Sequence, residues 1–197
     1  SFYSNKHITT GEGGMVLTSN KKFKDKIFDY KNLCFGKQNR FNHYDIGWNY
    51  RYTNLQAALG INQIKRIKKI IRKKKEIGKS YYSKLSKLSN IYIQKPKIKD
   101  FENVYWVVGI LILNKKMTAE KFRNELKKNN IETRSFFWPM NKQKAFKKYN
   151  IKFRGNFANS EYISKYGFYV PSGLNTSQND INHVCKSIIK IKNKYNF

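Results

Sequence analysis

The chain has 197 residues, of which 40% are hydrophobic and 16% aromatic, so its composition is that of a protein that folds around a core. This length allows one substantial domain or two small ones, and no segment approaches the roughly 20 consecutive apolar residues of a membrane span. The N-terminal residues lack a signal-peptide pattern, and two cysteines, Cys34 and Cys185, are too few for a disulfide framework. These features predict a cytoplasmic protein with no membrane partner and no metal site.

The formal net charge of +29 leaves three interpretations open. It reflects the composition bias of an AT-rich coding sequence, a surface that binds polyanions, or an accommodation of anionic substrates. The lysines are scattered along the chain, with one dense block at residues 64–76 that is typical of the solvated face of a helix. A basic nucleic-acid-binding module therefore remains an alternative, although nucleic acid is not the partner we expect.

The first half of the chain predicts mainly helices. After the glycine-rich GEGG turn, MVLT at residues 15–18 predicts a short buried strand. Apolar residues at helical spacing predict an amphipathic helix over residues 21–30. A polar loop follows, and Thr53 is placed to cap the next helix. The apolar stripe from residue 55 to residue 88 predicts one long helix or two abutting ones.

The second half alternates strands with helices, which favours a small α/β domain after about residue 89. Pro96 stops the first strand, and Thr118 is placed to cap a helix. The remaining elements follow from hydrophobic periodicity. We expect strands at 90–96, 104–113 and 131–139, helices at 118–130, 142–149, 158–166 and 180–195, and a turn at 170–175.

Generic motifs select no chemistry. The three histidines, His7, His43 and His183, lie far apart in the sequence and without metal-ligand spacing. There is no GxSxG elbow and no phosphate-binding GxxxxGK[ST] loop, and the single GEGG turn is a weak signal because glycine-rich turns are common. On these motifs alone the chain is a basic α/β protein.

The segment SFYSNKHITTGEGGMVLT, however, resembles the lysine segment of the sugar-nucleotide aminotransferases of the DegT/StrS type. These are pyridoxal 5′-phosphate enzymes of fold type I. The segment IGWNYRYTNLQAALGINQI resembles a second motif of that family, and ENVYWVVGILI, IETRSFFWPM and YVPSGLNTSQNDI resemble its small-domain segments in the same order. The resemblance covers essentially the whole chain.

The resemblance implies an α/β fold, the C-terminal portion of an aspartate aminotransferase-like enzyme. Residues 1–54 would be the remainder of the cofactor-binding large domain, residues 55–88 a long linking helix, and residues 89–197 the small α/β domain. The chain starts at the lysine segment, whereas the family's preceding half holds an Asp for the pyridine nitrogen of the cofactor. We therefore expect a fragment or a truncated gene product that is inactive alone, and an inactive remnant of the enzyme stays an alternative.

The resemblance also implies roles for cofactor-binding residues. Lys6 matches the lysine that binds pyridoxal 5′-phosphate covalently and later serves as the general base. Ser1 matches a ligand of the cofactor phosphate. Asn49 matches a residue that reaches the phosphate of the neighbouring subunit's cofactor, which implies a homodimer with shared sites. Two alternatives remain open: the match of Ser1 is only a consequence of where the chain starts, and Asn49 only caps a loop.

Four further residues are candidates for substrate binding. Glu12 belongs to the turn that passes close to cofactor and substrate, and the resemblance gives His43 and Arg51 as possible substrate contacts. Arg134 suits a phosphate or carboxylate because its guanidinium can donate two parallel hydrogen bonds. Structural roles for Arg51 and Arg134 remain equally open.

The substrates implied are glutamate and a nucleotide-linked 4-keto-6-deoxyhexose. NHYDIGWNYRYTN and ETRSFFWP are most similar to the GDP-perosamine synthase subgroup of this family. Relatives often have histidine where this chain has Asn141, and this departure leaves the sugar open.

Overall fold

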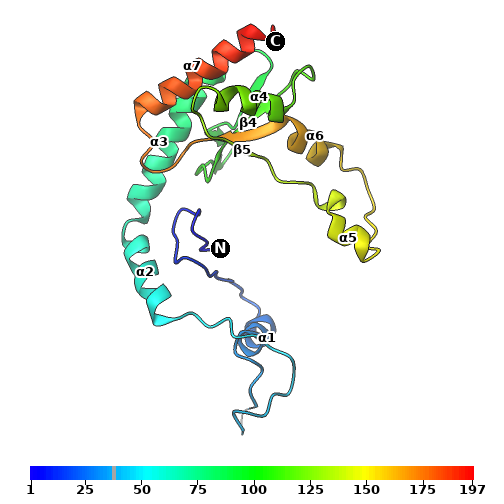
Figure 1. The fold of residues 1–197 in the computed structure, drawn as a ribbon. Coiled ribbons are helices and arrows are strands. Elements are labelled where there is room, and N and C mark those ends of the chain that lie inside the picture. The colour runs from blue at the N-terminus through cyan, green and yellow to red at the C-terminus, as the bar shows by residue number, and fades with distance from the viewer. Residues whose placement is uncertain (37–38) are drawn as a thin grey trace. The chain divides into compact units, whose positions relative to one another are not determined.

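The computed structural model describes residues 1–36 and 39–197, which form two compact units, unit 1 (Ser1–Lys68) and unit 2 (Lys69–Phe197). Figure 1 shows the elements of both. The boundaries expected after residues 54 and 88 remain predictions.

The described residues of unit 1 include helices α1 and α2, whose starts are set by side-chain caps. Helix α1 (Lys21–Lys31) begins where the Asn20 side chain accepts a hydrogen bond from the Phe23 amide, 3.2 Å away. Helix α2 (Asn54–Lys65) begins with a capping box in which the Thr53 hydroxyl accepts from the Gln56 amide and the Gln56 side chain accepts from the Thr53 amide. The predicted cap at Thr53 is thus confirmed, because a cap depends only on neighbouring residues.

The long helical stripe forms two abutting helices. The helical hydrogen-bond pattern breaks at Arg66, and helix α3 (Ile67–Leu85) follows. The stripe is exposed in α2, where Leu55 and Leu59 are exposed, and is buried in α3 at residues such as Ile77 and Leu85. Ile77, Tyr81 and Leu85 of α3 belong to the core of unit 2, which explains why the stripe is buried there.

The strand predicted at residues 15–18 is wrong. Met15, Val16 and Leu17 are 65%, 67% and 86% exposed and form no strand. A strand needs a partner for its backbone hydrogen bonds. Within the described residues of unit 1, β-type pairing is limited to the isolated bridges of Asn32 with Asn49 and of Phe35 with His43.

Unit 2 is built on a four-stranded antiparallel sheet with the order β1-β4-β6-β5. Its strands are β1 (Ile91–Ile93), β4 (Val108–Ile112), β5 (Arg134–Ser135) and β6 (Gly167–Val170), and a separate hairpin pairs β2 (Lys97–Ile98) with β3 (Phe101–Glu102). The strands predicted at 104–113 and 131–139 are therefore shorter than expected. Strand β5 pairs with Tyr169 and Phe168, two of the four residues of β6, and beyond it the Phe136 amide still donates to the Gly167 carbonyl (3.3 Å).

The helices of unit 2 connect and cover these strands. They are α4 (Ala119–Lys127), the 3₁₀ turn Met140–Lys142, α5 (Lys144–Lys148), α6 (Ala158–Tyr166) and α7 (Gln178–Lys194). Thr118 caps α4 as predicted, accepting a hydrogen bond from the Lys121 amide. Helix α4 packs against α6, α7 and strands β5 and β6 (Figure 1).

The core of unit 2 lies between these helices and the sheet. Phe122 of α4 and Phe168 of β6 are both fully buried, with ring centroids 5.4 Å apart. Other fully buried side chains of this core come from α3, β4 and α7: Tyr81, Leu85, Val108, Ile110, Ile112 and Ile188. Burial of these apolar side chains is the main stabilising term for unit 2.

The charged side chain of Lys74 is buried in unit 2. The Nζ atom of Lys74, on α3, donates hydrogen bonds to the carbonyl oxygens of Ser172 (2.6 Å) and Trp106 (3.1 Å). Lys74 is 8% exposed, and burial lowers its pKa from 10.5 to about 8. A neutral amine still has two N–H groups for these two carbonyls, so loss of the proton leaves both hydrogen bonds in place.

Because burial lowers the pKa of Lys74, we expect the free energy of unfolding to rise at alkaline pH. The pKa of Lys74 is about 8 in the folded state and about 10.4 in the unfolded state. Above pH 8 the folded protein therefore no longer buries a charged ammonium group, whereas the unfolded chain stays protonated up to about pH 10.4. Stability is expected to increase across this window by about 3 kcal/mol relative to Lys74→Met. The measurement is the free energy of unfolding by urea from pH 7 to 10.5 for both proteins. Parallel pH profiles would contradict the prediction.

Candidate functional site

Residues 1–14 form a closed loop that carries Lys6. The amide of Phe2 donates to the Gly13 carbonyl (2.9 Å), and the amide of Thr10 donates to the Phe2 carbonyl (3.0 Å). Within the loop, the amide of Lys6 donates to the Tyr3 carbonyl (3.0 Å), which closes a turn, and the Lys6 side chain is half-buried. The hydrogen bonds at its base therefore hold the loop that presents Lys6.

The loop is fixed to the start of α2 through Thr10. Thr10 is 5% exposed, and its hydroxyl donates to the Glu12 carbonyl (2.6 Å) and accepts from the hydroxyl of Tyr52. The side-chain amide of Gln56 donates to the same Glu12 carbonyl (3.3 Å). Tyr52 and Gln56 flank Thr53, so the residues that start the helix also position the lysine loop.

Gly13 is required where the loop meets Tyr52. Its backbone φ of +125° lies in a region that favours glycine, and a Cβ atom at this position would lie 2.6 Å from Cε2 of the Tyr52 ring. The next residue, Gly14, differs, because its nearest neighbour for a Cβ atom would be the Ser1 Cα at 3.9 Å. The close approach of loop and ring therefore depends on Gly13 and not on Gly14.

We expect Gly13→Ala to destabilise the loop by about 1–3 kcal/mol, because the substitution adds both backbone strain and a clash with Tyr52. Hydrogen exchange at the amides of Phe2 and Thr10, which close the loop, should accelerate about tenfold or more. Gly14→Ala is the matched control and should leave these rates nearly unchanged. Equal protection in both variants would show that Gly13 does not hold the loop.

A second segment of unit 1 holds His43, Asn49 and Arg51. The backbone around Asn49 runs beside the end of α1, where the Trp48 amide donates to the Tyr30 carbonyl (2.7 Å). The Asn49 side-chain oxygen accepts a hydrogen bond from Nε of Arg51 (2.8 Å). Arg51 therefore has a structural partner in the side-chain amide of Asn49.

His43 is oriented by two contacts. Its Nδ1 atom lies 2.6 Å from the Leu33 carbonyl oxygen, and its ring lies 4.9 Å from the ring of Phe35. A carbonyl can only accept, so Nδ1 carries a proton and Nε2 is the atom left for another partner. This arrangement fixes the plane of an exposed imidazole.

The structure brings some of the expected site residues together. Ser1, Lys6 and Glu12 share the N-terminal loop, where Ser1 and Glu12 are exposed and the Ser1 hydroxyl accepts from the Tyr3 amide at 3.4 Å. The second segment joins this loop because Tyr52 follows Arg51 directly and reaches Thr10.

Arg134 belongs to unit 2. It is exposed on β5 opposite Tyr169, while its neighbour Ser135 pairs with Phe168, which packs on α4. Directly paired residues point to the same side of a sheet and successive residues alternate. Arg134 therefore lies on the sheet face that points away from α4.

Sequence reasoning missed Tyr52 and Gln56 as supports of the lysine loop. The signal for Gln56 was present, since Thr followed three residues later by Gln is a capping-box pattern. Their contacts with Thr10 and Glu12 span more than 40 residues, and no local pattern reports them.

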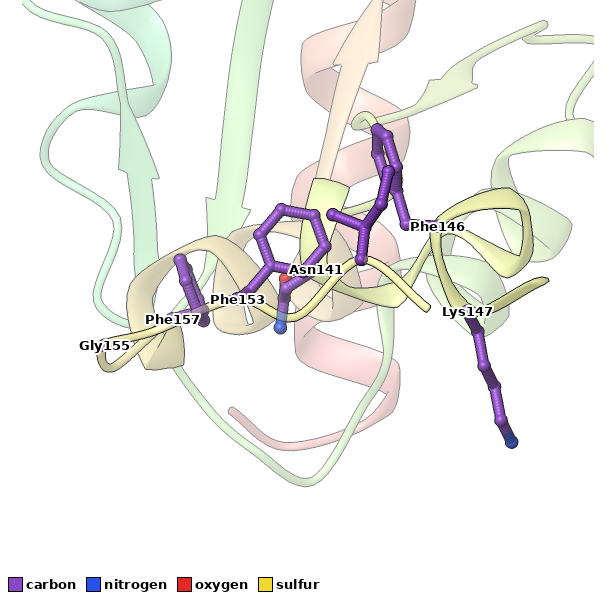
Figure 2. Close-up of a pocket in the computed structure, with 7 residues that line it drawn as sticks. Asn141, Phe146, Lys147, Phe153, Gly155 and Phe157 are labelled. Carbon is purple, nitrogen blue, oxygen red and sulfur yellow. The ribbon is translucent and has the colours of Figure 1, made fainter. Parts of the chain in front are cut away.

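A hollow of about 390 Å³ lies in unit 2 beside the segment from residue 140 to residue 157. Figure 2 shows its lining, in which aromatic rings gather while the Lys147 side chain extends away from them. It is lined by Asn141, Phe146, Lys147, Ile151, Phe153, Gly155 and Phe157. The side-chain amide of Asn141 donates to Oε1 of Glu161 (2.9 Å), so Asn141 is held by α6.

Two kinds of feature are absent from the described residues. Residues 1–36 and 39–197 contain no group of three or more His, Cys, Asp or Glu side chains placed to hold a metal ion. Within the same residues no helix has the length and apolar character needed to cross a membrane.

Comparison with protein families identifies the chain. The model of the DegT/DnrJ/EryC1/StrS aminotransferase family matches residues 1–189. The chain belongs to this family. Its expected cofactor, pyridoxal 5′-phosphate, is the cofactor of these aminotransferases, and one similar structure is described as containing bound hydrated PLP.

Two curated relatives are GDP-perosamine synthases, the subgroup that the sequence resembles. The chain is 33% identical over 188 residues to GDP-perosamine synthase of Escherichia coli O157:H7, which covers 95% of this chain and 50% of the relative. It is 32% identical over 197 residues to GDP-perosamine synthase of Vibrio cholerae, covering 100% of this chain and 52% of the relative. The chain thus spans about half the length of these relatives.

Solved structures confirm the expected fold, part of a fold type I aminotransferase. Helicobacter pylori PseC, an aminotransferase of pseudoaminic acid biosynthesis, superposes with a TM-score of 0.86 at 22% identity and covers 98% of this chain and 52% of its own. Escherichia coli GDP-4-keto-6-deoxy-D-mannose-3-dehydratase superposes with a TM-score of 0.82 at 17% identity, covering 95% and 52%. At these identities the likeness concerns the fold.

Proposed function

We propose that the protein to which these residues belong transfers an amino group from glutamate to a nucleotide-linked 4-keto-6-deoxyhexose. The observation that carries the proposal is Lys6, half-buried in a loop closed at its base and fixed to α2 through Thr10 and Tyr52. The identity of about one third with two GDP-perosamine synthases supports this substrate class.

The residues of the lysine loop fit pyridoxal 5′-phosphate. The primary amine of Lys6 can bind an aldehyde, and the absence of a side chain at Gly13 lets the loop pack directly on Tyr52. The Ser1 hydroxyl and the Asn49 amide are suited to a phosphate. When bound, the cofactor accepts the amino group and withdraws electrons from the carbon that loses its proton.

In the proposed mechanism Lys6 moves protons in both half-reactions. It removes the proton from the α-carbon of glutamate, and later delivers a proton to C4 of the sugar. The hydrogen bonds at the base of the loop hold the backbone that carries Lys6. A general base that is already in position needs no reorganisation during proton transfer. Because Thr10 and Tyr52 fix the loop to α2, we assign them the role of positioning Lys6.

The substrate contacts are part of this proposal. His43 has Nε2 available to a sugar hydroxyl, and exposed Arg134 is suited to a carboxylate or phosphate. Arg51 holds Asn49, so we assign it the orientation of that amide, while Glu12 contributes its backbone carbonyl to the turn. The proposal includes a cytoplasmic homodimer in which Asn49 serves the neighbouring subunit's site.

The test uses the protein encoded by the complete reading frame that contains residues 1–197. That protein should convert keto-sugars to amino sugars with glutamate, measured by mass spectrometry across GDP-, UDP- and dTDP-linked substrates, while residues 1–197 alone should turn over at a negligible rate. Failure of the protein from the complete reading frame with every keto-sugar would reject the activity. Turnover by residues 1–197 alone would reject the inactivity of this chain.

A further inference from the structure

Strand β5 is a short edge strand that carries an exposed arginine. It consists of Arg134 and Ser135, and it lies at the end of the sheet, where it pairs with β6. Directly after the strand, the Phe136 amide donates a hydrogen bond to the Gly167 carbonyl (3.3 Å). An edge strand of two residues has few backbone hydrogen bonds, so other contacts matter for the position of Arg134.

The ring of Phe136 lies across the sheet in a slot that two glycines leave open. A Cβ atom at Gly109 of β4 would lie 2.6 Å from Cζ of this ring, and a Cβ atom at Gly167 of β6 would lie 2.2 Å from its Cδ2 atom. The ring also contacts Tyr169 edge to face, with centroids 6.3 Å apart. A glycine within a strand often marks such a close approach. The Phe136 side chain therefore reaches from the end of β5 over β6 to β4.

Neither glycine is required by its backbone conformation. The glycines with positive φ are elsewhere, and Gly167 has a φ of −104° that other residues adopt. A Cβ atom at Gly167 would also lie 2.5 Å from the Ile163 carbonyl oxygen. At Gly109, by contrast, the next nearest atoms belong to the Gln94 side chain at ordinary distances of 3.4 and 3.5 Å. The close contact at Gly109 is thus with the Phe136 ring alone.

Arg134 lies on the same face of the sheet as this slot. Tyr169 pairs with Arg134 on one side and with Gly109 on the other, and directly paired residues point to the same side. Arg134 is exposed, and within residues 1–36 and 39–197 its guanidinium has no ion pair or hydrogen bond. It is therefore available to an anionic ligand.

We propose that Phe136 is a positioning residue that holds Arg134 for the anionic group of a substrate. The inference rests on the proposed function, in which Arg134 contacts substrate. The ring in its slot ties the backbone two residues beyond Arg134 to β6 and β4. A side chain on a fixed backbone loses less conformational freedom when it binds. The anionic group is a phosphate of the nucleotide or a carboxylate of glutamate, since either accepts two parallel hydrogen bonds from a guanidinium.

The experiment measures KM and kcat of the protein encoded by the complete reading frame that contains residues 1–197. The variants are Arg134→Ala, Phe136→Ala and the two combined. Phe101→Ala is the matched control, since this phenylalanine is 78% exposed on the β2–β3 hairpin. KM is measured separately for glutamate and for the keto-sugar nucleotide, so the substrate whose KM rises identifies the source of the anionic group. Circular dichroism of each variant checks the fold.

We expect Arg134→Ala to raise one of these KM values about tenfold or more, because it removes hydrogen bonds to a charged group. Phe136→Ala should raise the same KM about threefold or more while kcat changes by less than about twofold, as expected for lost binding. In the combined variant Phe136→Ala should add nothing, because the ring acts through Arg134. Phe101→Ala should leave both KM values unchanged.

Two outcomes would overturn the proposal. An equal rise for Phe136→Ala with and without Arg134 would mean that the ring does not act through the guanidinium. Unchanged KM values for Arg134→Ala in an active enzyme would remove the substrate contact but leave the proposed function standing. An inactive unmodified enzyme would instead reject the proposed function itself.

A further variant tests the slot without changing β5. Gly109→Ala places a methyl group where the tip of the Phe136 ring lies, so it should raise the same KM as Phe136→Ala does. Removing the ring makes room for the methyl group, so Gly109→Ala with Phe136→Ala should be no worse than Phe136→Ala alone. No effect of Gly109→Ala, or an added loss in the combined variant, would show that the slot does not hold Arg134.

Discussion

Replacing Lys6 by alanine is expected to lower the rate of amino-group transfer by at least about 10²-fold, the lower end of what a positioned general base contributes. Loss of the covalent attachment of the cofactor should lower the rate further, because residues 1–14 contain no other lysine. The protein assayed is the product of the complete reading frame that contains residues 1–197.

The control for Lys6 separates chemistry from charge. Lys6→Arg keeps the positive charge but cannot be deprotonated, so it should be as inactive as the alanine variant. Lys22→Ala removes an exposed lysine of α1 and should retain full activity. A second readout is independent of turnover: after incubation with pyridoxal 5′-phosphate and reduction with borohydride, mass spectrometry should find the cofactor on Lys6. Labelling of another lysine with activity retained in Lys6→Ala would refute the assignment.

The second large effect is expected at Phe122, in the core of unit 2. Its side chain is 0% exposed and lies against Phe168 (5.4 Å between ring centroids) and Phe197 (6.1 Å). Phe122→Ala should cost about 3–5 kcal/mol, because it removes buried apolar area and leaves a cavity. A domain is stable by only about 5–15 kcal/mol, so this loss is a large part of the total.

Urea unfolding followed by circular dichroism measures this cost. Tyr149→Ala is the comparison, since this aromatic side chain is 70% exposed and its removal should change the free energy of unfolding by less than about 0.5 kcal/mol. A fall in midpoint with an unchanged denaturant slope is expected for Phe122→Ala. Equal midpoints for the two variants would mean that Phe122 is not part of a closely packed core.

Local patterns predicted the helices well. The caps at Thr53 and Thr118 were correct because a cap involves residues three positions apart. Strands were predicted less well, since their extent depends on a partner elsewhere in the chain. The MVLT segment has the composition of a strand, yet it is exposed and unpaired in unit 1.

For the site, the motif around ITTGEGG singled out Lys6, and the family match supports the motif. The supports of the lysine loop were not predictable in the same way. Tyr52 and Thr10 are 42 residues apart, and Asn141 is turned toward Glu161, 20 residues away. The roles of six other residues remain predictions: Ser1, Glu12, His43, Asn49, Arg51 and Arg134. The experiments above test Lys6 and its loop.

By itself, the sequence determined the family and the helices and gave Lys6 as the candidate lysine, because motifs, periodicity and caps are properties of neighbouring residues. Only the tertiary structure decided which half of the apolar stripe is buried, where each strand ends and which side chains hold the lysine loop. It also placed the lysines of α3 beside those of the β2–β3 hairpin. The physical reason is the same in each case: burial, strand pairing and charge clustering depend on residues distant in sequence, and the fold alone brings them together.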